Sequence, residues 1–382
     1  MAGVAAPVKP SSRDNFSIST FISRLRSKRT RKSKTLPRAR EIPITSPLPL
    51  VHPHHQPLLP NLGWTTVTFP QPAPHASSHD PSTSAPASSA PPDKHPIQAA
   101  YEDLFAASAT FFSLPDTEKS KWKTRLGSEE GWSSIPGEKE FITLRTLAYT
   151  PDVLREPAKR FWDLMGEYMT TCLGRVEQNL SMDEGALSRF VGPCGTMQTE
   201  EEHRTATMVR LFRYEGWEEK VVAEAHADLG LLSFVVGRVP GLEVWGGDGQ
   251  GWRAVEREYE GAGEACGTLL GGRMLERFSN GGVRAGGHRV VSYGAPEMKG
   301  EGEKRYRFSI VFVLRAHEEV LVDSEMLETG VTGKWERPVR GVTAGEVYAE
   351  IRGAHFNINT GVQERELQRR KLEAKKTGGG GK

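Results

Sequence analysis

Short apolar segments separated by glycine-rich or charged turns fill the stretch from Thr205 to His317. The first, TATMVRLFRYEG, alternates its side chains in the way that is typical of a β-strand. Its predicted faces are Met208, Arg210, Phe212 and Tyr214 on one side and Val209, Leu211 and Arg213 on the other. The segments that follow are HADLGLLSFVVG, LEVWGGDGQGWRAVE, CGTLLGGRMLERFSNG, HRVVSYG and RYRFSIVFVLRAH. Because no long helix separates them, an antiparallel sandwich or barrel is predicted and a parallel βαβ sheet is disfavoured.

Helical periodicity appears before and after this stretch. An apolar stripe at helical spacing runs from Ile97 to Phe112, a short helix is expected from Asp116, and a long amphipathic helix is expected over about 151–180. DEGALSRFV is a further helical candidate. After the β-rich stretch, Thr343 is expected to cap the helix TAGEVYAEIRGAHF, and GVQERELQRRKLEAKK predicts a charged, exposed helix. A β core flanked by N-terminal helices and a C-terminal helix follows from this pattern.

The first 95 residues have a different composition and are expected to be largely disordered. From Phe21 to Arg40 there are nine Lys or Arg and no acid, and from Pro37 to Pro92 the chain is rich in Pro, Ser, Ala and His. Such sequence buries too little apolar surface to offset its ordering entropy. The exception is PNLGWTTVTFP at 60–70, which predicts one strand at the edge of the fold. The cluster KRTRKSK is interpreted as a solvated tail, with a nuclear or organellar address or a nucleic-acid arm as alternatives.

The composition, net charge and cysteine count of the whole chain narrow the class of protein. Only 37% of the 382 residues are hydrophobic, and the net charge of +2 gives no overall attraction to nucleic acid. Three cysteines are too few for a disulfide framework, so a reducing compartment is expected. The sequence has no apolar run of about 18 residues that would predict a membrane span. We therefore expect a monomeric cytoplasmic protein, unless the basic tail directs it to the nucleus or an organelle.

Three residues within the β-rich stretch have the chemistry of a metal site. His226 and Asp228 are two apart, so a strand would point both to one face, and His288 would come from another strand. Two imidazoles and one carboxylate are the ligand set of non-haem Fe(II) oxygenases. A lone histidine in a strand is more often a core or surface residue. However, these three residues and Arg307 would all be polar at inward positions of apolar strands, and four coincidental burials would be costly.

Four sequence motifs, in a fixed order along the chain, resemble those of a known enzyme family. They are HxDxG at 226–230, GLEVW at 241–245, SNG at 279–281 followed by His288-Arg289-Val290, and RxS formed by Arg307 and Ser309. Over roughly 96–372 the chain resembles the iron- and 2-oxoglutarate-dependent dioxygenases of the isopenicillin N synthase group. That resemblance implies an α+β, mainly β fold, with a double-stranded β-helix (jelly roll) barrel flanked by N-terminal helices and a C-terminal helix.

The resemblance also implies residue roles. His226, Asp228 and His288 would bind Fe(II), and Arg307, with Ser309 and Tyr214, would bind 2-oxoglutarate. Phe212 stands where many members have asparagine, which would leave the co-substrate with one polar contact fewer or change the pocket wall. Phe212 and Phe356 are the expected substrate-pocket residues, and Phe356 and Ile358 are expected to contribute a lid contact beside the C-terminal helix. The 295–305 segment is longer than the family's usual connection, and we expect it to form a protruding hairpin loop.

The function implied is oxidation of a small organic metabolite by hydroxylation, desaturation or cyclisation, with O2 and conversion of 2-oxoglutarate to succinate. The implied cofactors are Fe(II) and 2-oxoglutarate, with ascorbate as an additive, and no membrane partner is expected. Three alternatives remain: a non-catalytic binding or regulatory protein, an iron oxidase that does not use 2-oxoglutarate, and, more weakly, an enzyme acting on nucleic acid or protein. The expected organisation is a tail at 1–95, a helical region at 96–200, the catalytic domain at 201–372 and a flexible end at 373–382.

Overall fold

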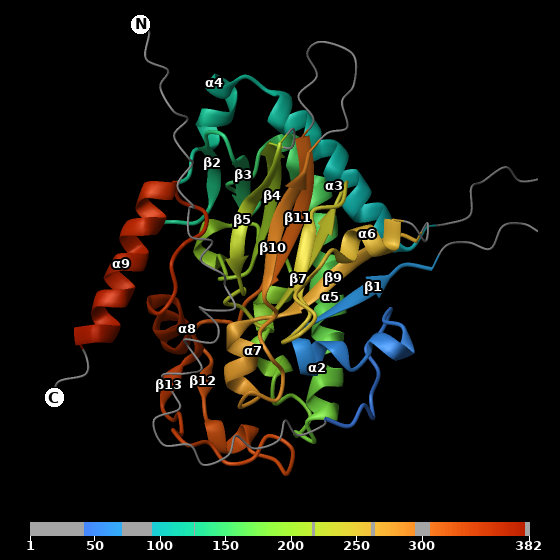
Figure 1. Cartoon of the computed structure of the whole chain (residues 1–382), viewed down its shortest axis with the longest axis vertical. Helices are drawn as coiled ribbons and strands as arrows, with labels where there is room; N and C mark the ends of the chain where they lie inside the picture. The colour runs from blue at the N-terminus through green and yellow to red at the C-terminus, as the bar shows by residue number, and fades with distance from the viewer. Residues whose placement is uncertain are drawn as a thin grey trace, which may run out of the picture. The chain divides into compact units, whose positions relative to one another are not determined.

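The computed structural model describes residues 42–70, 94–125, 127–215, 218–260, 264–294 and 306–378. The basic cluster KRTRKSK and the 295–305 loop lie outside the described residues. The described part of the chain is built on antiparallel sheets with helices around them (Figure 1). The antiparallel architecture predicted from the short strands is therefore correct.

The largest sheet has seven strands. Their order across the sheet is β1 (Trp64–Thr68), β9 (Cys266–Gly271), β6 (Leu232–Gly237), β11 (Tyr306–Leu314), β4 (Met208–Glu215), β3 (Lys139–Leu144) and β2 (Gly131–Ile135). A second sheet has the order β5 (Glu219–His226), β10 (His288–Tyr293), β7 (Leu242–Trp245) and β8 (Trp252–Arg253), and β12 (Leu321–Val322) pairs with β13 (Val342–Thr343). As predicted, the strand near residue 65 lies at an edge of the large sheet. Strands β1 to β3 precede residue 201, so this sheet crosses the boundary at 200 that the sequence analysis placed.

The alternation predicted for β4 separates two hydrophobic cores. Val209 and Leu211 belong to a core between the large sheet and the helices. Phe212 and Tyr214 belong to a second core, which also contains Val244 of β7 and other residues of the four-stranded sheet. The two sheets therefore pack face to face, and the inner faces of β4 and its neighbours point into the space between them.

Two long helices cover the outer face of the large sheet, as predicted: α3 (Pro96–Ser113) and α5 (Asp152–Asn179) (Figure 1). Phe161 and Trp162 of α5 contact the ring of Phe312 on β11, with centroids 6.3 and 5.4 Å away. The other α-helices of the described residues are α2 (Leu58–Leu62), α4 (Asp116–Lys119), α6 (Val255–Glu260), α7 (Arg273–Phe278), α8 (Ala344–Gly353) and α9 (Val362–Gly378). Thr343 caps α8 through a capping box, as expected. Among the described residues, no helix combines the length and apolar character needed to span a bilayer.

Three local predictions are corrected. Helices α6 and α7 occupy parts of two segments that the sequence analysis assigned to strands. Strand β9 ends at Gly271, and Gly272 occupies the N-cap of α7, whose buried residues Met274, Leu275 and Phe278 have helical spacing. The predicted helix DEGALSRFV is instead a turn followed by a 3-10 helix at Ser188–Phe190. Gly185 in this turn has a φ of +85°, which is incompatible with a helix.

Residues 42–63 are packed, although only 60–70 was expected to be ordered in this part of the chain. The Gln56 side chain accepts a hydrogen bond from the amide of Leu48 and donates to the carbonyls of Leu48 and Val51. The Asn179 side chain of α5 bonds both backbone groups of Ser46. Composition underestimated the order because these buried side chains satisfy irregular backbone.

Candidate functional site

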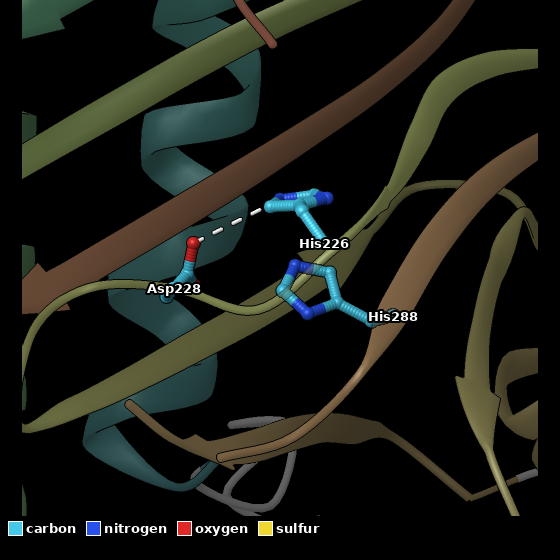
Figure 2. Close-up of side chains that lie close together, drawn as sticks. All are labelled: His226, Asp228 and His288. Carbon is cyan, nitrogen blue, oxygen red and sulfur yellow. Dashed lines mark ion pairs between the residues drawn. The ribbon is translucent and has the colours of Figure 1, made fainter. Parts of the chain in front are cut away.

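The structure brings His226, Asp228 and His288 together between the two sheets (Figure 2). His226 is the last residue of β5 and His288 the first of β10, and antiparallel pairing places them opposite each other. Their ring centroids are 4.1 Å apart, and Nε2 of His226 lies 3.8 Å from Oδ1 of Asp228. One possible ligand atom from each residue lies within 4.8 Å of the others. This spacing allows all three side chains to reach a single ion.

Asp228 reaches the cluster from a turn and not from a strand, because β5 ends at His226. The carbonyl of Asp228 accepts a hydrogen bond of 2.8 Å from the amide of Arg273, at the start of α7. This contact requires glycine, since a Cβ on Gly272 would lie 2.0 Å from the carbonyl oxygen of Gly230. A Cβ on Gly230, the glycine of HxDxG, would lie 2.6 Å from the carbonyl oxygen of Leu314, so both glycines allow the close backbone approach that positions the segment carrying the carboxylate.

The hydrogen bonds of the cluster suit a metal ion. Nδ1 of His226 lies 2.7 Å from the carbonyl oxygen of Glu224, and Nδ1 of His288 lies 3.1 Å from that of Gly286. A carbonyl can only accept, so each Nδ1 carries a proton, and in the neutral ring Nε2 is the nitrogen with the lone pair for a metal. Oδ2 of Asp228 is buried without a hydrogen-bond partner. Two imidazoles and this carboxylate fit Fe(II) and would leave coordination positions open.

The electrostatics favour the protonation states that bind a metal. Burial, reinforced by the neighbouring His288, lowers the pKa of His226 well below its usual value. Burial acts to raise the pKa of Asp228, but His288 and His226 outweigh it and the pKa is lowered overall. The histidine is thus neutral and the aspartate ionised near neutral pH, as metal ligation requires.

Tyr214, Arg307 and Ser309 share the inner face of the large sheet. Register pairs Arg307 with Tyr214, and Tyr214 with Lys139 on the next strand. We call Lys139, Tyr214 and Arg307 the basic row. The neighbouring cross-strand row contains Ser309, Phe212 and Phe141. Burial raises the pKa of Tyr214 to about 12, so its phenol stays protonated and able to donate a hydrogen bond.

Arg307 is held by contacts that the sequence did not indicate. Its Nη2 lies 2.9 and 3.1 Å from the carboxylate oxygens of Glu256 on α6, and its Nε donates to the carbonyl of Val239 at 3.0 Å. A Cβ on Gly241 would lie 2.4 Å from Nε of Arg307. Nη1 of Arg307 is buried without a partner. The guanidinium is thus paired with Glu256 through Nη2 and keeps Nη1 as a donor group for a ligand.

The two predicted pocket residues differ in their surroundings. Phe212 lies in the inner core, with its ring 5.1 Å from that of Tyr214 and 5.6 Å from that of Phe141. Phe356 lies between α8 and α9, where the guanidinium of Arg369 stands 4.5 Å from its ring centroid. Only Phe212 is therefore placed on the inner wall by these contacts.

A buried lysine was missed by the sequence analysis. Lys139 on β3 is 2% exposed, and its ammonium donates a hydrogen bond of 3.3 Å to the carbonyl of Ile358, the other residue expected near the lid. Alternation in KEFITL, which puts Lys139 on the same face as Phe141 and Thr143, was the signal that could have found it.

Comparisons with known proteins show what the chain is similar to in sequence and in fold. No family model matches the chain. It is 26% identical over 267 residues, 58% of this chain and 76% of the relative, to the 2-oxoglutarate-dependent dioxygenase ecdK of Aspergillus rugulosus. The structure of a full-length Neurospora crassa protein in complex with alpha-KG and 5-formyluracil matches with a TM-score of 0.53 and 19% identity, covering 77% of this chain and 86% of that one. The rice dioxygenase for auxin oxidation gives a TM-score of 0.50 and 19% identity, covering 76% and 90%. The resemblance predicted from the motifs is confirmed as a similarity: the chain is similar in sequence to a 2-oxoglutarate-dependent dioxygenase and in fold to the two solved structures.

Proposed function

We propose that this protein is an Fe(II)- and 2-oxoglutarate-dependent oxygenase that hydroxylates, desaturates or cyclises a small organic metabolite. The observation that carries the proposal is a pair of buried, unpartnered polar atoms, Oδ2 of Asp228 and Nη1 of Arg307, in the motifs that bind iron and 2-oxoglutarate in this family. Unsatisfied buried polar atoms are costly, which supports a bound ligand at both positions. We also propose that the two facing sheets form the double-stranded β-helix barrel of the family, with 201–372 as its catalytic part.

The side chains have separate roles in this proposal. His226, His288 and Asp228 would hold iron, with the carbonyls of Glu224 and Gly286 orienting the two rings. Iron bound there couples the reduction of O2 and the oxidative decarboxylation of 2-oxoglutarate to succinate and CO2 with oxidation of the substrate.

The large sheet would hold the co-substrate. Arg307 would pair through Nη1 with the distal carboxylate of 2-oxoglutarate, and the hydroxyls of Ser309 and Tyr214 would complete the site. The surrounding rings of Phe212 and Phe141 exclude water from the inner face. Proteins similar to this chain bind or oxidise small molecules, a uracil derivative for the Neurospora crassa protein and auxin for the rice enzyme, which supports a metabolite as the substrate.

The test is release of succinate by purified protein supplied with Fe(II), ascorbate and 2-oxoglutarate, alongside measurement of bound Fe(II). We expect succinate release even without the organic substrate, through uncoupled turnover. His226→Ala should abolish iron binding and succinate release, whereas His203→Ala, at an exposed histidine, should leave both unchanged. Absence of both signals in the wild-type protein, with no difference on changing His226, contradicts the proposal.

One observation favours a second candidate, an iron oxidase that does not use 2-oxoglutarate. Glu256 already neutralises part of the charge on Arg307, so a second carboxylate gains less there than at an unpaired arginine. In this case the protein binds Fe(II) through His226, but it releases no succinate and 2-oxoglutarate does not stabilise it against heat.

A further inference from the structure

Lys139 occupies a position on the inner face of the large sheet to which the proposed function assigns neither the metal nor the co-substrate. It lies on β3 beside Tyr214 in the basic row, and its ammonium lies 5.7 Å from the ring centroid of Phe212. Its positive charge also acts on His226, lowering the pKa of that ring after the larger effects of burial and His288. The lysine is therefore buried between the two sheets, within electrostatic range of the metal-ligand cluster.

The charge of Lys139 is not matched by an acid. In the described part of the chain, the structure gives it no carboxylate at ion-pair distance, and its single hydrogen bond goes to a neutral carbonyl. The adjacent Glu138 is taken by Arg365 of α9, at 2.6 and 3.0 Å. Lysines are almost never fully buried unless paired, so a buried ammonium of this kind indicates a missing anion.

The wall beside Lys139 is aromatic and carries a second cation at its other end. Phe141 and Phe212 lie in the next cross-strand row, and Arg210 lies in the row beyond, opposite Thr143. Arg210 donates to the Thr143 hydroxyl at 2.7 Å, and its nearest acid, Glu129 at 3.9 Å, pairs more closely with Arg315, at 2.6 Å. A ligand along this wall would meet positive charge at both ends and two rings between them.

We propose that Lys139 anchors a carboxylate of the organic substrate, which makes the substrate class a small organic acid whose apolar or aromatic body lies against Phe141 and Phe212. The inference deepens the proposed function and rests on it, because the body of the acid must lie near the metal to be oxidised. The substrate carboxylate would supply the negative charge that Lys139 lacks in the protein, through charge-assisted hydrogen bonds. Arg307, at the other end of the basic row, remains the co-substrate residue.

A pH dependence follows for binding. Burial lowers the pKa of Lys139 to about 7, with Glu138 acting to raise it and Arg365 and Arg210 acting to lower it. The other groups facing it are Tyr214, a neutral phenol, and the neutral ring of His226. A bound carboxylate stabilises the ammonium, so binding takes up a proton and the affinity for the acid falls as the pH rises above 7.

Equilibrium binding of matched acids and amides tests the proposal. The probes are phenylacetate, cinnamate and octanoate, each against its primary amide, titrated calorimetrically into the full-length protein with Fe(II) and 2-oxoglutarate in the absence of O2. We expect at least one acid to bind about tenfold or more tightly than its amide, as hydrogen bonds to charged groups imply. Lys139→Gln should remove that preference, Lys139→Arg should keep part of it, and Lys121→Gln, at a side chain 64% exposed, should leave it intact.

Other outcomes are distinguishable. Equal binding of every acid and its amide, or a preference that survives Lys139→Gln, overturns the proposal. If Lys139→Gln weakens acids and amides alike and increases proteolysis near Ile358, the lysine only anchors the segment before α9, and the proposal is again wrong. A fall in 2-oxoglutarate affinity in this variant reassigns Lys139 to the co-substrate and also overturns it. Failure of the proposed function appears separately, as absence of iron binding and succinate release in the wild type.

Discussion

The metal-ligand cluster and the basic row lie on facing sheets and are held in different ways. His226 and His288 are placed by the pairing of β5 with β10, and main-chain carbonyls orient their rings. Arg307 and Lys139 are long side chains on the large sheet, positioned by contacts with α6 and with the segment before α9. Backbone pairing therefore positions the metal-ligand cluster, whereas contacts between side chains and neighbouring segments position the basic row.

Lys139→Met tests how much the buried lysine of the basic row destabilises the folded protein, and it should have the largest effect of the variants proposed here. The folded protein loses the lysine proton near pH 7 while the unfolded chain keeps it to about 10.5, so the free energy of unfolding of the wild type rises with pH over this window. Removing the buried amine should stabilise the fold at pH 7 by on the order of 4 kcal/mol and abolish that rise. Denaturant unfolding at pH 7 and pH 9.5 measures both. Unchanged stability at pH 7 means that the ammonium has an unrecognised partner.

Arg307→Gln tests whether binding of 2-oxoglutarate can be weakened without a change in Fe(II) binding. It removes the charge that pairs with the distal carboxylate of 2-oxoglutarate and should raise the Kd for 2-oxoglutarate about a hundredfold, roughly 3 kcal/mol, with Fe(II) affinity unchanged. Arg253→Gln, at a partly exposed arginine paired with Glu258, serves as the control. Titration of each variant with 2-oxoglutarate gives the comparison. A parallel loss of iron affinity shows that the metal-ligand cluster and the basic row are not independent.

Gly241→Ala should shift Arg307 without touching its charge. The new methyl group would lie 2.4 Å from Nε of Arg307, so the guanidinium must move. We expect the KM for 2-oxoglutarate to rise about tenfold, or about 1.4 kcal/mol, with iron binding preserved. Gly174→Ala is the matched control, since nothing lies within 4 Å of the added methyl group. Succinate formation against 2-oxoglutarate concentration measures the effect, and an unchanged KM means that Arg307 does not bind the co-substrate.

Glu256→Gln should give the smallest change, in the opposite direction. The amide oxygen can still accept from the backbone amides of Gly241 and Leu242, while the negative charge beside Arg307 disappears. The affinity for 2-oxoglutarate should rise about threefold, because less of the arginine charge is neutralised before binding. Glu258→Gln on the same helix is the control. A weaker affinity in the Glu256 variant assigns that carboxylate a positioning role instead.

The sequence predicted the parts of the site that depend on local structure. HxD and the RxS pair were readable because strand alternation and a tight turn fix their spacing, and the helices α3, α5 and α8 followed from apolar periodicity and capping. Glu256 was missed because its short helix α6 stands in a segment that resembled a strand. Lys139 was missed because a lysine in a turn-rich segment is normally exposed, and only tertiary packing buries it.

The most direct test is an anaerobic absorption titration of the Fe(II)-loaded protein with 2-oxoglutarate. A 2-oxo acid that chelates Fe(II) gives a visible charge-transfer band, which reports the metal end and the co-substrate end in one measurement. We expect the band in the wild type, the same band at about hundredfold higher 2-oxoglutarate in Arg307→Gln, and none in His226→Ala. A wild-type protein that gives no band, or a His226→Ala variant that gives the same band, contradicts the assignment of His226, Asp228 and His288 as the iron site.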